Sequence, residues 1–215
     1  MEIELWRAMQ TFWDAKAAEP GAITPGDQWQ IAVGDANEIL HEFDGAGATL
    51  VEVGCGEGRL AGPLSAKVAR YIGVDISSVA LSRAPCETIW IADPSEFRNA
   101  LRGIDVDIVC SWTVFSHLPP PVLEWWLGEC FAVLRPGGTL RARFEHTERT
   151  LEHRFDRVPP NEFWEGRWYP DYMVASMLER AGFRVTGLPF EYISVWRTLE
   201  CSRVWRAEKP RNDNG

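Results

Sequence analysis

Apolar runs separated by polar breaks predict a regular alternation of short strands and helices. The predicted strands are apolar and rich in β-branched residues, and they cover 49–53, 71–74, 88–92, 106–112 and 139–144. The helices between them are predicted at 60–69, in a short segment ending at 84, at 97–101 and at 121–134. Strict alternation of this kind favours a parallel sheet with helices on both faces.

The segments on either side of this alternation are predicted to lie outside the parallel sheet. Helices at 2–18 and about 29–43 make residues 1–48 a helical N-terminal cover. A further helix is predicted at 172–181, followed by strands at 183–186 and 194–205. We expect these last strands to be an antiparallel pair and 208–215 to be a disordered tail. The predicted fold is a single α/β domain over 1–215, Rossmann-like and doubly wound, with a mostly parallel sheet.

A glycine-rich turn follows the first predicted strand, in the stretch TLVEVGCGEGR. Gly54, Gly56 and Gly58 stand at alternating positions. Glycine permits the positive φ of a tight strand-to-helix turn, and without a Cβ it lets a ligand lie against the backbone. The dinucleotide fingerprint G-x-G-x-x-G would require glycine where this chain has Arg59. An NAD-dependent oxidoreductase is therefore a less favoured alternative.

An acidic residue ends the second predicted strand. Asp75 is placed there to accept hydrogen bonds from both ribose hydroxyls of an adenosine. Its alternative role is to cap the helix that starts near Ser77.

Five motifs occur in the order found in class I S-adenosylmethionine-dependent methyltransferases, which the chain resembles over about residues 49–144. The motifs are TLVEVGCGEGR, VDIS (74–77), AD (92–93), IVCSW (108–112) and LRPGGTL (134–140). The resemblance implies a Rossmann-like fold, S-adenosylmethionine as the cofactor and methyl transfer as the activity. Residues 1–48 and 145–215 match no motif of the family, and these are the regions that select substrate in it.

The resemblance also implies which residues contact the cofactor. They are Glu52, Gly54, Cys55, Gly56, Gly58, Asp75, Ile76, Asp93, Pro94, Ser111 and Trp112. Asp93 is implied as the contact for the adenine amino group, and its alternative role is a helix cap. Pro94 departs from the family pattern because proline has no backbone N–H to offer the adenine ring. Ser95 and Glu96 are candidates to substitute for that contact.

S-adenosylmethionine, the methyl donor that the resemblance implies, needs little activation by the protein. Its sulfonium methyl group is already electrophilic, so no metal is expected, and the acceptor must be held in line with that group. A base is needed only where the acceptor must lose a proton. His117, after the fourth predicted strand, and His146, after the fifth, are the candidates. The alternative for His117 is a packed histidine that positions the turn at Pro119.

Residues 145–169 form a connection far longer than the usual strand-to-helix loop of roughly 2–6 residues. Its aromatic residues, Phe163, Trp164, Trp168 and Tyr169, argue for order because their burial is favourable. We expect a cap that, with the leading helix and its Trp13, covers an acceptor pocket. The alternative is that these aromatic residues are simply core.

Composition narrows the class of partner. A formal net charge of −9 argues against nucleic acid as the main partner. The five cysteines show no metal-ligand spacing and predict buried thiols in a reducing cytosol. No signal peptide and no apolar run near ~20 residues is present, so a cytoplasmic protein with no membrane partner is expected. We expect a small-molecule substrate, whose acceptor atom the sequence leaves open, as it does the oligomeric state. A non-catalytic cofactor-binding partner or sensor is the main alternative, and a protein or nucleic-acid methyltransferase is another.

Overall fold

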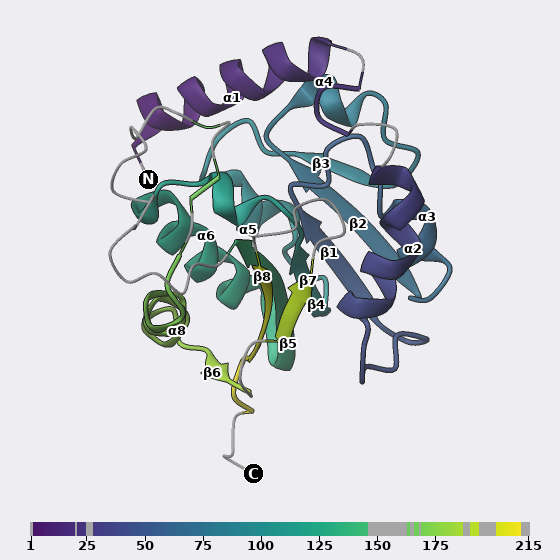
Figure 1. The fold of residues 1–215 in the computed structure, drawn as a ribbon, viewed down its shortest axis with the longest axis vertical. Helices are drawn as coiled ribbons and strands as arrows, with labels where there is room; N and C mark the ends of the chain where they lie inside the picture. Colours follow the sequence, from purple (N-terminus) through teal and green to yellow (C-terminus); the bar gives the residue numbers. More distant parts are fainter. Residues whose placement is uncertain are drawn as a thin grey trace. The chain divides into compact units, whose positions relative to one another are not determined.

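A computed structural model describes residues 2–19, 21–24, 28–145, 163, 166–167, 169–186, 190–193 and 201–211. The chain divides into two compact units, Glu2–Cys110 and Ser111–Gly215. Figure 1 labels their helices and strands.

Four parallel strands form the sheet of the first unit. They are β1 (Thr49–Val53), β2 (Arg70–Asp75), β3 (Thr88–Trp90) and β4 (Val106–Ser111), in the order β3-β2-β1-β4. The inner strand β1 is buried from Leu50 to Val53, as a near-continuous apolar run requires. Val53 pairs with Val74, and Asp75 pairs with Trp90, so the carboxyl ends of β1, β2 and β3 meet at one edge.

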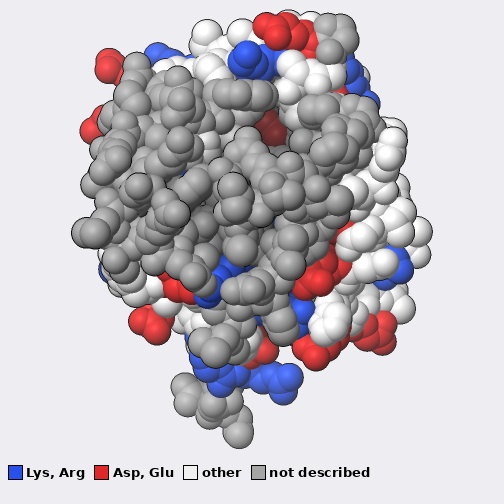
Figure 2. Space-filling view, in the orientation of Figure 1, with Lys and Arg blue, Asp and Glu red and all other residues white. Residues whose placement is uncertain are grey.

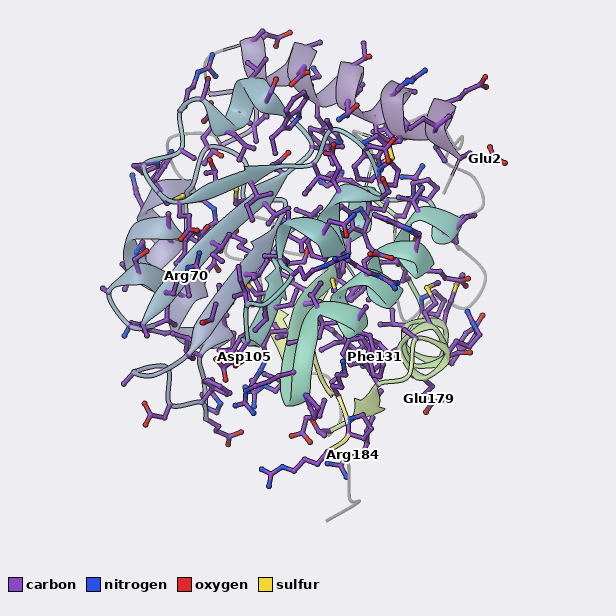
Figure 3. All side chains as sticks on the ribbon, turned by 180° about the vertical axis from the view of Figure 1, so that it is seen from behind. Glu2, Arg70, Asp105, Phe131, Glu179 and Arg184 are labelled. Atoms are coloured by element: carbon purple, nitrogen blue, oxygen red, sulfur yellow. The ribbon has the colours of Figure 1, made fainter. Side chains whose placement is uncertain are left out.

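The opposite end of β2 is exposed. Arg70, labelled in Figure 3, starts this strand and donates to Glu87 through Nε at 3.0 Å and Nη2 at 2.6 Å. The site residue that the sequence predicts on this strand, Asp75, lies at the other end.

Two of the three helices that connect these strands end earlier than the sequence predicted, and the third has the predicted length but begins one residue earlier. They are α3 (Ala61–Ser65), α4 (Ser78–Leu81) and α5 (Glu96–Ala100). The prediction of a helix over 60–69 is wrong beyond Ser65. Pro63 lies within α3, and the chain then closes in a tighter turn, with the N–H of Lys67 donating to the carbonyl of Leu64 at 2.8 Å.

Two helices precede the sheet, as predicted. The first, α1 (Ile3–Ala18), buries Trp6 and Met9. The second, α2 (Gln28–Ile39), ends four residues before the predicted Phe43, with Glu42 in the left-handed region at φ 59°. The N–H of Phe43 donates to the carbonyl of Leu40 at 2.9 Å, which closes the turn that ends this helix.

The second unit contains an antiparallel sheet, as predicted for the C-terminal strands. Its elements are η1 (Phe115–His117), α6 (Pro120–Val133), β5 (Leu134–Glu145), α8 (Asp171–Arg180), β6 (Arg184–Val185), β7 (Phe190–Ile193) and β8 (Cys201–Glu208). Both β5 and β6 pair with β8, and so does β7. The predicted strand at 194–205 is described only from Cys201 onward.

The end of β8 corrects two predictions. Strand β5 begins at Leu134 rather than 139, because Gly137 and Gly138 pair with Lys209. The Gly137 N–H donates to the Lys209 carbonyl, and the Lys209 N–H donates to the Gly138 carbonyl, each at 2.9 Å. The Lys209 ammonium also donates to the carbonyls of Phe131 and Leu134, at 3.0 and 2.7 Å. A disordered tail beginning at Glu208 is therefore wrong for Glu208 and Lys209, since both have partners.

The core of the second unit is built on α6. Its buried apolar residues are Val122, Leu123, Trp126, Leu127 and Cys130. Phe131, labelled in Figure 3, packs edge-on against Phe183 with ring centroids 5.1 Å apart. The Lys209 ammonium lies 4.9 Å from the centroid of the Phe131 ring.

The surface and the thiols add two observations. Figure 2 shows acidic and basic side chains interspersed over the described part of the face that it draws. None of the described helices has the length and apolar character to cross a bilayer. Cys55, Cys110 and Cys130 are buried free thiols, as predicted. The prediction is wrong for Cys86, which lies half-buried in the loop before β3, and the side chain of Cys201 is outside the described part.

Candidate active site

The glycine loop after β1 requires glycine at its three alternating positions. Gly54, Gly56 and Gly58 have φ of 75°, 55° and 80°. A Cβ on Gly58 would lie 2.8 Å from Cδ of Pro85. The N–H groups of Gly54 and Cys55 both donate to the Val74 carbonyl, at 2.7 and 3.1 Å. The loop is thus attached to the carboxyl end of β2 and presents bare backbone.

Asp75 binds that loop through its side chain. Oδ2 accepts from the N–H of Gly56 at 2.9 Å, and Oδ1 accepts from the N–H of Ser77 at 2.8 Å. Burial raises the pKa of Asp75, and these two backbone donors partly offset the effect. Each carboxylate oxygen has a second lone pair, so the same side chain can still accept from ribose hydroxyls.

Glu52 is buried beneath the loop, with 3% of its surface exposed. The Tyr71 hydroxyl donates to its Oε2 at 2.5 Å. Burial raises the pKa of Glu52 to about 7 and raises the pKa of Tyr71 too, so the phenol stays a donor. Cys55 fits beside this pair because β2 has glycine at Gly73, where a Cβ would lie 2.7 Å from Cys55 Sγ. The loop backbone, rather than the Cys55 thiol, is thus the part of this residue suited to a ligand.

Arg59 has a structural partner that the sequence did not reveal. Its Nη1 lies 2.5 Å from Oδ2 of Asp35, on α2. Both side chains are buried, with relative exposures of 9% and 0%. The residue that departs from the dinucleotide fingerprint therefore joins α2 to the glycine loop.

The carboxyl end of β3 is organised by two acidic side chains. Asp93 Oδ1 accepts from the N–H and the hydroxyl of Ser95, at 2.9 and 2.7 Å, and these bonds lower the pKa of Asp93. Glu96 Oε2 accepts from the N–H groups of Ala92 and Asp93, at 2.9 and 3.3 Å. Asp93 thus forms a local turn with Ser95, the residue before α5, whose N-terminus has no side-chain cap, and its contact with adenine stays a prediction. It keeps further acceptor capacity. Pro94, which offers no N–H, follows it.

Helix α1 lies against the same edge. Trp6 Nε1 donates to the carbonyl of Ala92 at 3.1 Å, and Gln10 Nε2 donates to the carbonyls of Ile91 and Ala92 at 3.0 and 3.1 Å. The sequence pointed instead to Trp13, whose ring packs edge-on against Phe12 at 5.2 Å between centroids. Gln10 gave no sequence signal, because its partners are 66 to 82 residues away.

Ser111 is the last residue of β4, Trp112 follows it, and both are buried. The next residue, Thr113, has φ 67°. A β-branched residue in this region is a strained outlier of the kind that clusters at functional sites. Its hydroxyl donates to the Trp112 carbonyl at 2.5 Å. No sequence pattern predicts this conformation.

The segment that contains His117 is fixed by residues from the predicted cap. Arg167 donates to the Ser116 carbonyl through its backbone N–H and to the His117 carbonyl through Nη1, each at 2.6 Å. The Tyr169 hydroxyl donates to the Leu118 carbonyl at 2.6 Å. Arg167 and Tyr169 are buried, as is Phe163, so in the described part of 145–169 these side chains are core. His146, Trp164 and Trp168 lie outside the described residues.

Metal ligation has no candidate in the described part of the chain, where His, Cys, Asp and Glu form no cluster of three or more that could hold an ion.

Sequence comparison finds similarity between this chain and known methyltransferases. A family described as a methyltransferase domain matches residues 50–138. An S-adenosylmethionine-dependent methyltransferase of Mycolicibacterium smegmatis is 31% identical over 142 residues, 65% of this chain and 53% of the relative. A ubiquinone biosynthesis O-methyltransferase of a Bradyrhizobium species is 31% identical over 108 residues, 44% of this chain and 39% of the relative. The chain thus spans about half the length, or less, of the curated relatives it matches.

A solved structure shares the fold. Magnesium protoporphyrin IX methyltransferase (ChlM) of Synechocystis PCC 6803, solved with S-adenosylmethionine bound, aligns with a TM-score of 0.67 at 14% identity, over 97% of this chain and 98% of that one. The fold is therefore the Rossmann-like α/β fold of class I methyltransferases, with its mostly parallel sheet and antiparallel C-terminal strands. Over residues 50–138 the chain is thus similar to a methyltransferase domain, and a structure of the same fold was solved with S-adenosylmethionine bound.

Proposed function

We propose that the chain transfers a methyl group from S-adenosylmethionine to an oxygen, nitrogen or carbon nucleophile of a small molecule. The observation that carries this proposal is the contact between Asp75 Oδ2 and the N–H of Gly56, which brings the acidic end of β2 to the glycine loop. The names of two similar proteins refer to ubiquinone biosynthesis and to magnesium protoporphyrin IX, which supports a small-molecule acceptor.

We assign the donor site to the carboxyl edge of the first unit. The glycine-loop backbone from Gly54 to Gly58 would face the methionine part, with Glu52 beneath it. Asp75 would accept from the ribose hydroxyls, Ile76 would pack on the adenine ring, and Asp93 and Pro94 would border the ring. Ser111, the last residue of β4, and Trp112, which follows it, would add backbone contacts. The positive-φ glycines and the remaining lone pairs of Asp75 fit this cofactor.

The cofactor supplies an electrophilic methyl group when bound, so the task of the chain is to orient the acceptor and exclude water. Where the acceptor carries a proton that must leave, we assign the base to His117, with His146 as the second candidate. Arg167 and Tyr169 fix the backbone on which His117 lies. Residues 1–48 would form the cover over the donor, and the predicted cap at 145–169 lies mostly outside the described residues.

The net charge of −9 supports a small molecule over nucleic acid as the acceptor. The free cysteines of the described part suit a reducing compartment, and we infer a cytoplasmic location.

The experiment is donor turnover with fractionated small molecules from a cell extract. We expect S-adenosylhomocysteine to accumulate together with a product heavier by one methylene group, detected by mass spectrometry. Gly56→Val places a side chain in the donor site and should abolish both signals. Donor binding without turnover in any fraction would contradict catalysis and favour a non-catalytic sensor.

A further inference from the structure

One side-chain amide connects α1 to the ends of two strands. Gln10 Nε2 lies 3.0 Å from the carbonyl oxygen of Ile91, 3.1 Å from that of Ala92 and 3.5 Å from that of Ile76. Ile76 follows β2, and Ile91 and Ala92 follow β3. The side chain therefore spans the interval between the two segments that the donor site uses at its adenine end.

Two indole groups support the same carbonyls. Trp6 Nε1 donates to Ala92 at 3.1 Å, and Trp90 Nε1 donates to Ile76 at 3.0 Å. Trp6 is fully buried, so its indole position is fixed by packing. The carbonyl side of both segments is thus held by donors from α1 and β3.

The N–H sides of the same peptide groups are held as well. A trans peptide directs its carbonyl and its N–H in opposite directions. The peptide after Ile76 donates to Asp75, and the peptides after Ile91 and Ala92 donate to Glu96. Three peptide planes are consequently held from both sides, and Gln10 is the one side chain whose amide reaches all three carbonyls.

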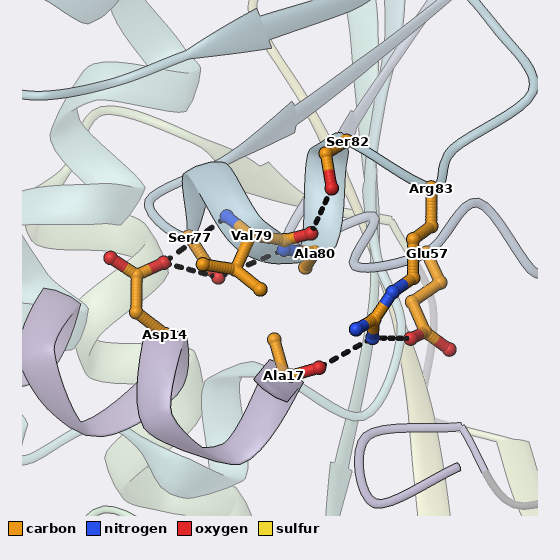
Figure 4. A network of polar contacts seen from close by, with 8 residues as sticks. All are labelled: Asp14, Ala17, Glu57, Ser77, Val79, Ala80, Ser82 and Arg83. Atoms are coloured by element: carbon orange, nitrogen blue, oxygen red, sulfur yellow. Dashed lines mark hydrogen bonds and ion pairs between the residues drawn. The ribbon is translucent and has the colours of Figure 1, made fainter. Parts of the chain in front are cut away.

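The other half of α1 is anchored separately (Figure 4). Asp14 Oδ1 accepts from the Ser77 hydroxyl at 2.7 Å and from the N–H of Val79 at 3.3 Å. Arg83 Nη1 donates to the Ala17 carbonyl and, at 2.8 Å, to Glu57 of the glycine loop. Helix α1 therefore remains attached when the Gln10 contacts are removed, which makes Gln10 testable by itself.

We propose that Gln10 is a positioning residue that sets the gap between Ile76 and the Ala92–Asp93 segment and thereby makes the donor site selective for adenine. This inference rests on the proposed donor site. A planar base between two segments is recognised by the width of the gap and by the groups at its edge. Because Gln10 fixes both carbonyl edges, its loss should widen the range of bases that are accepted.

The test is calorimetric binding of S-adenosylhomocysteine and of its inosine analogue, in which an oxo group replaces the adenine amino group. For Gln10→Ala we expect about tenfold weaker binding of S-adenosylhomocysteine, the scale of one or two lost hydrogen bonds. We also expect a several-fold smaller preference over the inosine analogue. Trp6→Phe removes one N–H and keeps a packed ring, so it should show a smaller change in the same direction.

Two control variants test whether the change in binding is specific to the loss of Gln10. Thr11→Ala changes an exposed residue of the same helix, and Gln30→Ala removes the same amide from an exposed position of α2. Both should bind as the wild type does. An unchanged base preference in folded Gln10→Ala and Trp6→Phe would overturn the inference, even where both ligands bind more weakly. Failure of the wild type to bind S-adenosylhomocysteine would instead overturn the donor site itself.

Discussion

Arg59 and Asp35 form a buried ion pair, 2.5 Å between Nη1 and Oδ2, that joins the glycine loop to helix α2. Their relative exposures are 9% and 0%, so each charge depends on its partner in a region of low dielectric.

Removing one member of this pair should be costly. Asp35→Asn leaves the Arg59 charge buried without a full counter-charge, and we expect a loss of about 3–5 kcal/mol in the free energy of unfolding, measured by urea denaturation. The double variant Asp35→Leu/Arg59→Met should recover most of that loss. Arg70→Ala breaks an exposed pair with Glu87 and should cost less than about 1 kcal/mol. A cost for Asp35→Asn as small as that of Arg70→Ala would contradict the account.

Stability should depend on the protonation of Glu52. Its pKa rises from 4.5 to about 7 on folding, so the folded state binds the proton more tightly than the unfolded state. The free energy of unfolding should therefore decrease as pH rises from about 4.5 to about 7, by up to roughly 3 kcal/mol.

Glu52→Gln should remove this dependence while keeping an acceptor for the Tyr71 hydroxyl. Relative to wild type, the variant should gain stability between pH 5 and pH 8 in urea titrations. Glu87→Gln is the control, because Arg70 lowers the pKa of that exposed side chain and no loss with rising pH is expected. Parallel pH profiles for the wild type and Glu52→Gln would refute this role.

At most positions a glycine variant is less stable than an alanine variant, and the strain at Thr113 predicts the reverse. At φ 67° a residue with a Cβ is disfavoured, so Thr113→Gly should be more stable than Thr113→Ala by about 1 kcal/mol. Both variants lose the hydroxyl contact to Trp112, which makes them a matched pair. Thermal unfolding compares them, and a more stable alanine variant would show that the position is not strained.

Tyr169 should affect the acceptor and not the donor. Tyr169→Phe removes the hydrogen bond to the Leu118 carbonyl, next to His117, and we expect a two- to tenfold change in acceptor KM or kcat, on the scale of one hydrogen bond. S-adenosylhomocysteine affinity should stay unchanged. Tyr172→Phe, at an exposed position of α8, is the control and should alter neither. Equal effects of the two variants would remove Tyr169 from this role.

The sequence predicted the elements better than the contacts between them. Apolar β-branched runs locate β1, β2 and β4, and the acidic residue Asp75 locates the carboxyl end of β2, because these are local patterns. The ion pair of Arg59 and the carbonyl contacts of Gln10 join residues 24 to 82 positions apart, so no local pattern contains them.

At two further places the sequence allowed two roles for the same residues, and local contacts in the structure bear on the choice. Asp93 was weighed between adenine and a helix cap, and its carboxylate instead accepts two hydrogen bonds from Ser95 in a local turn before α5. Phe163 and Tyr169 predicted an ordered segment correctly for these described residues. Their burial, however, shows that an aromatic pattern does not distinguish a pocket lining from a core.

The central claim is that the edge at Asp75 binds S-adenosylmethionine, and a pair of matched variants tests it most directly. Asp75→Ala removes a carboxylate that accepts from Gly56 N–H at the carboxyl end of the sheet. Asp107→Ala removes one that accepts from Thr49 N–H, at 2.8 Å, at the amino end. Calorimetric titration with S-adenosylmethionine should show at least about tenfold weaker binding for Asp75→Ala and wild-type affinity for Asp107→Ala. Wild-type affinity in folded Asp75→Ala, or equal loss in both variants, would contradict the account.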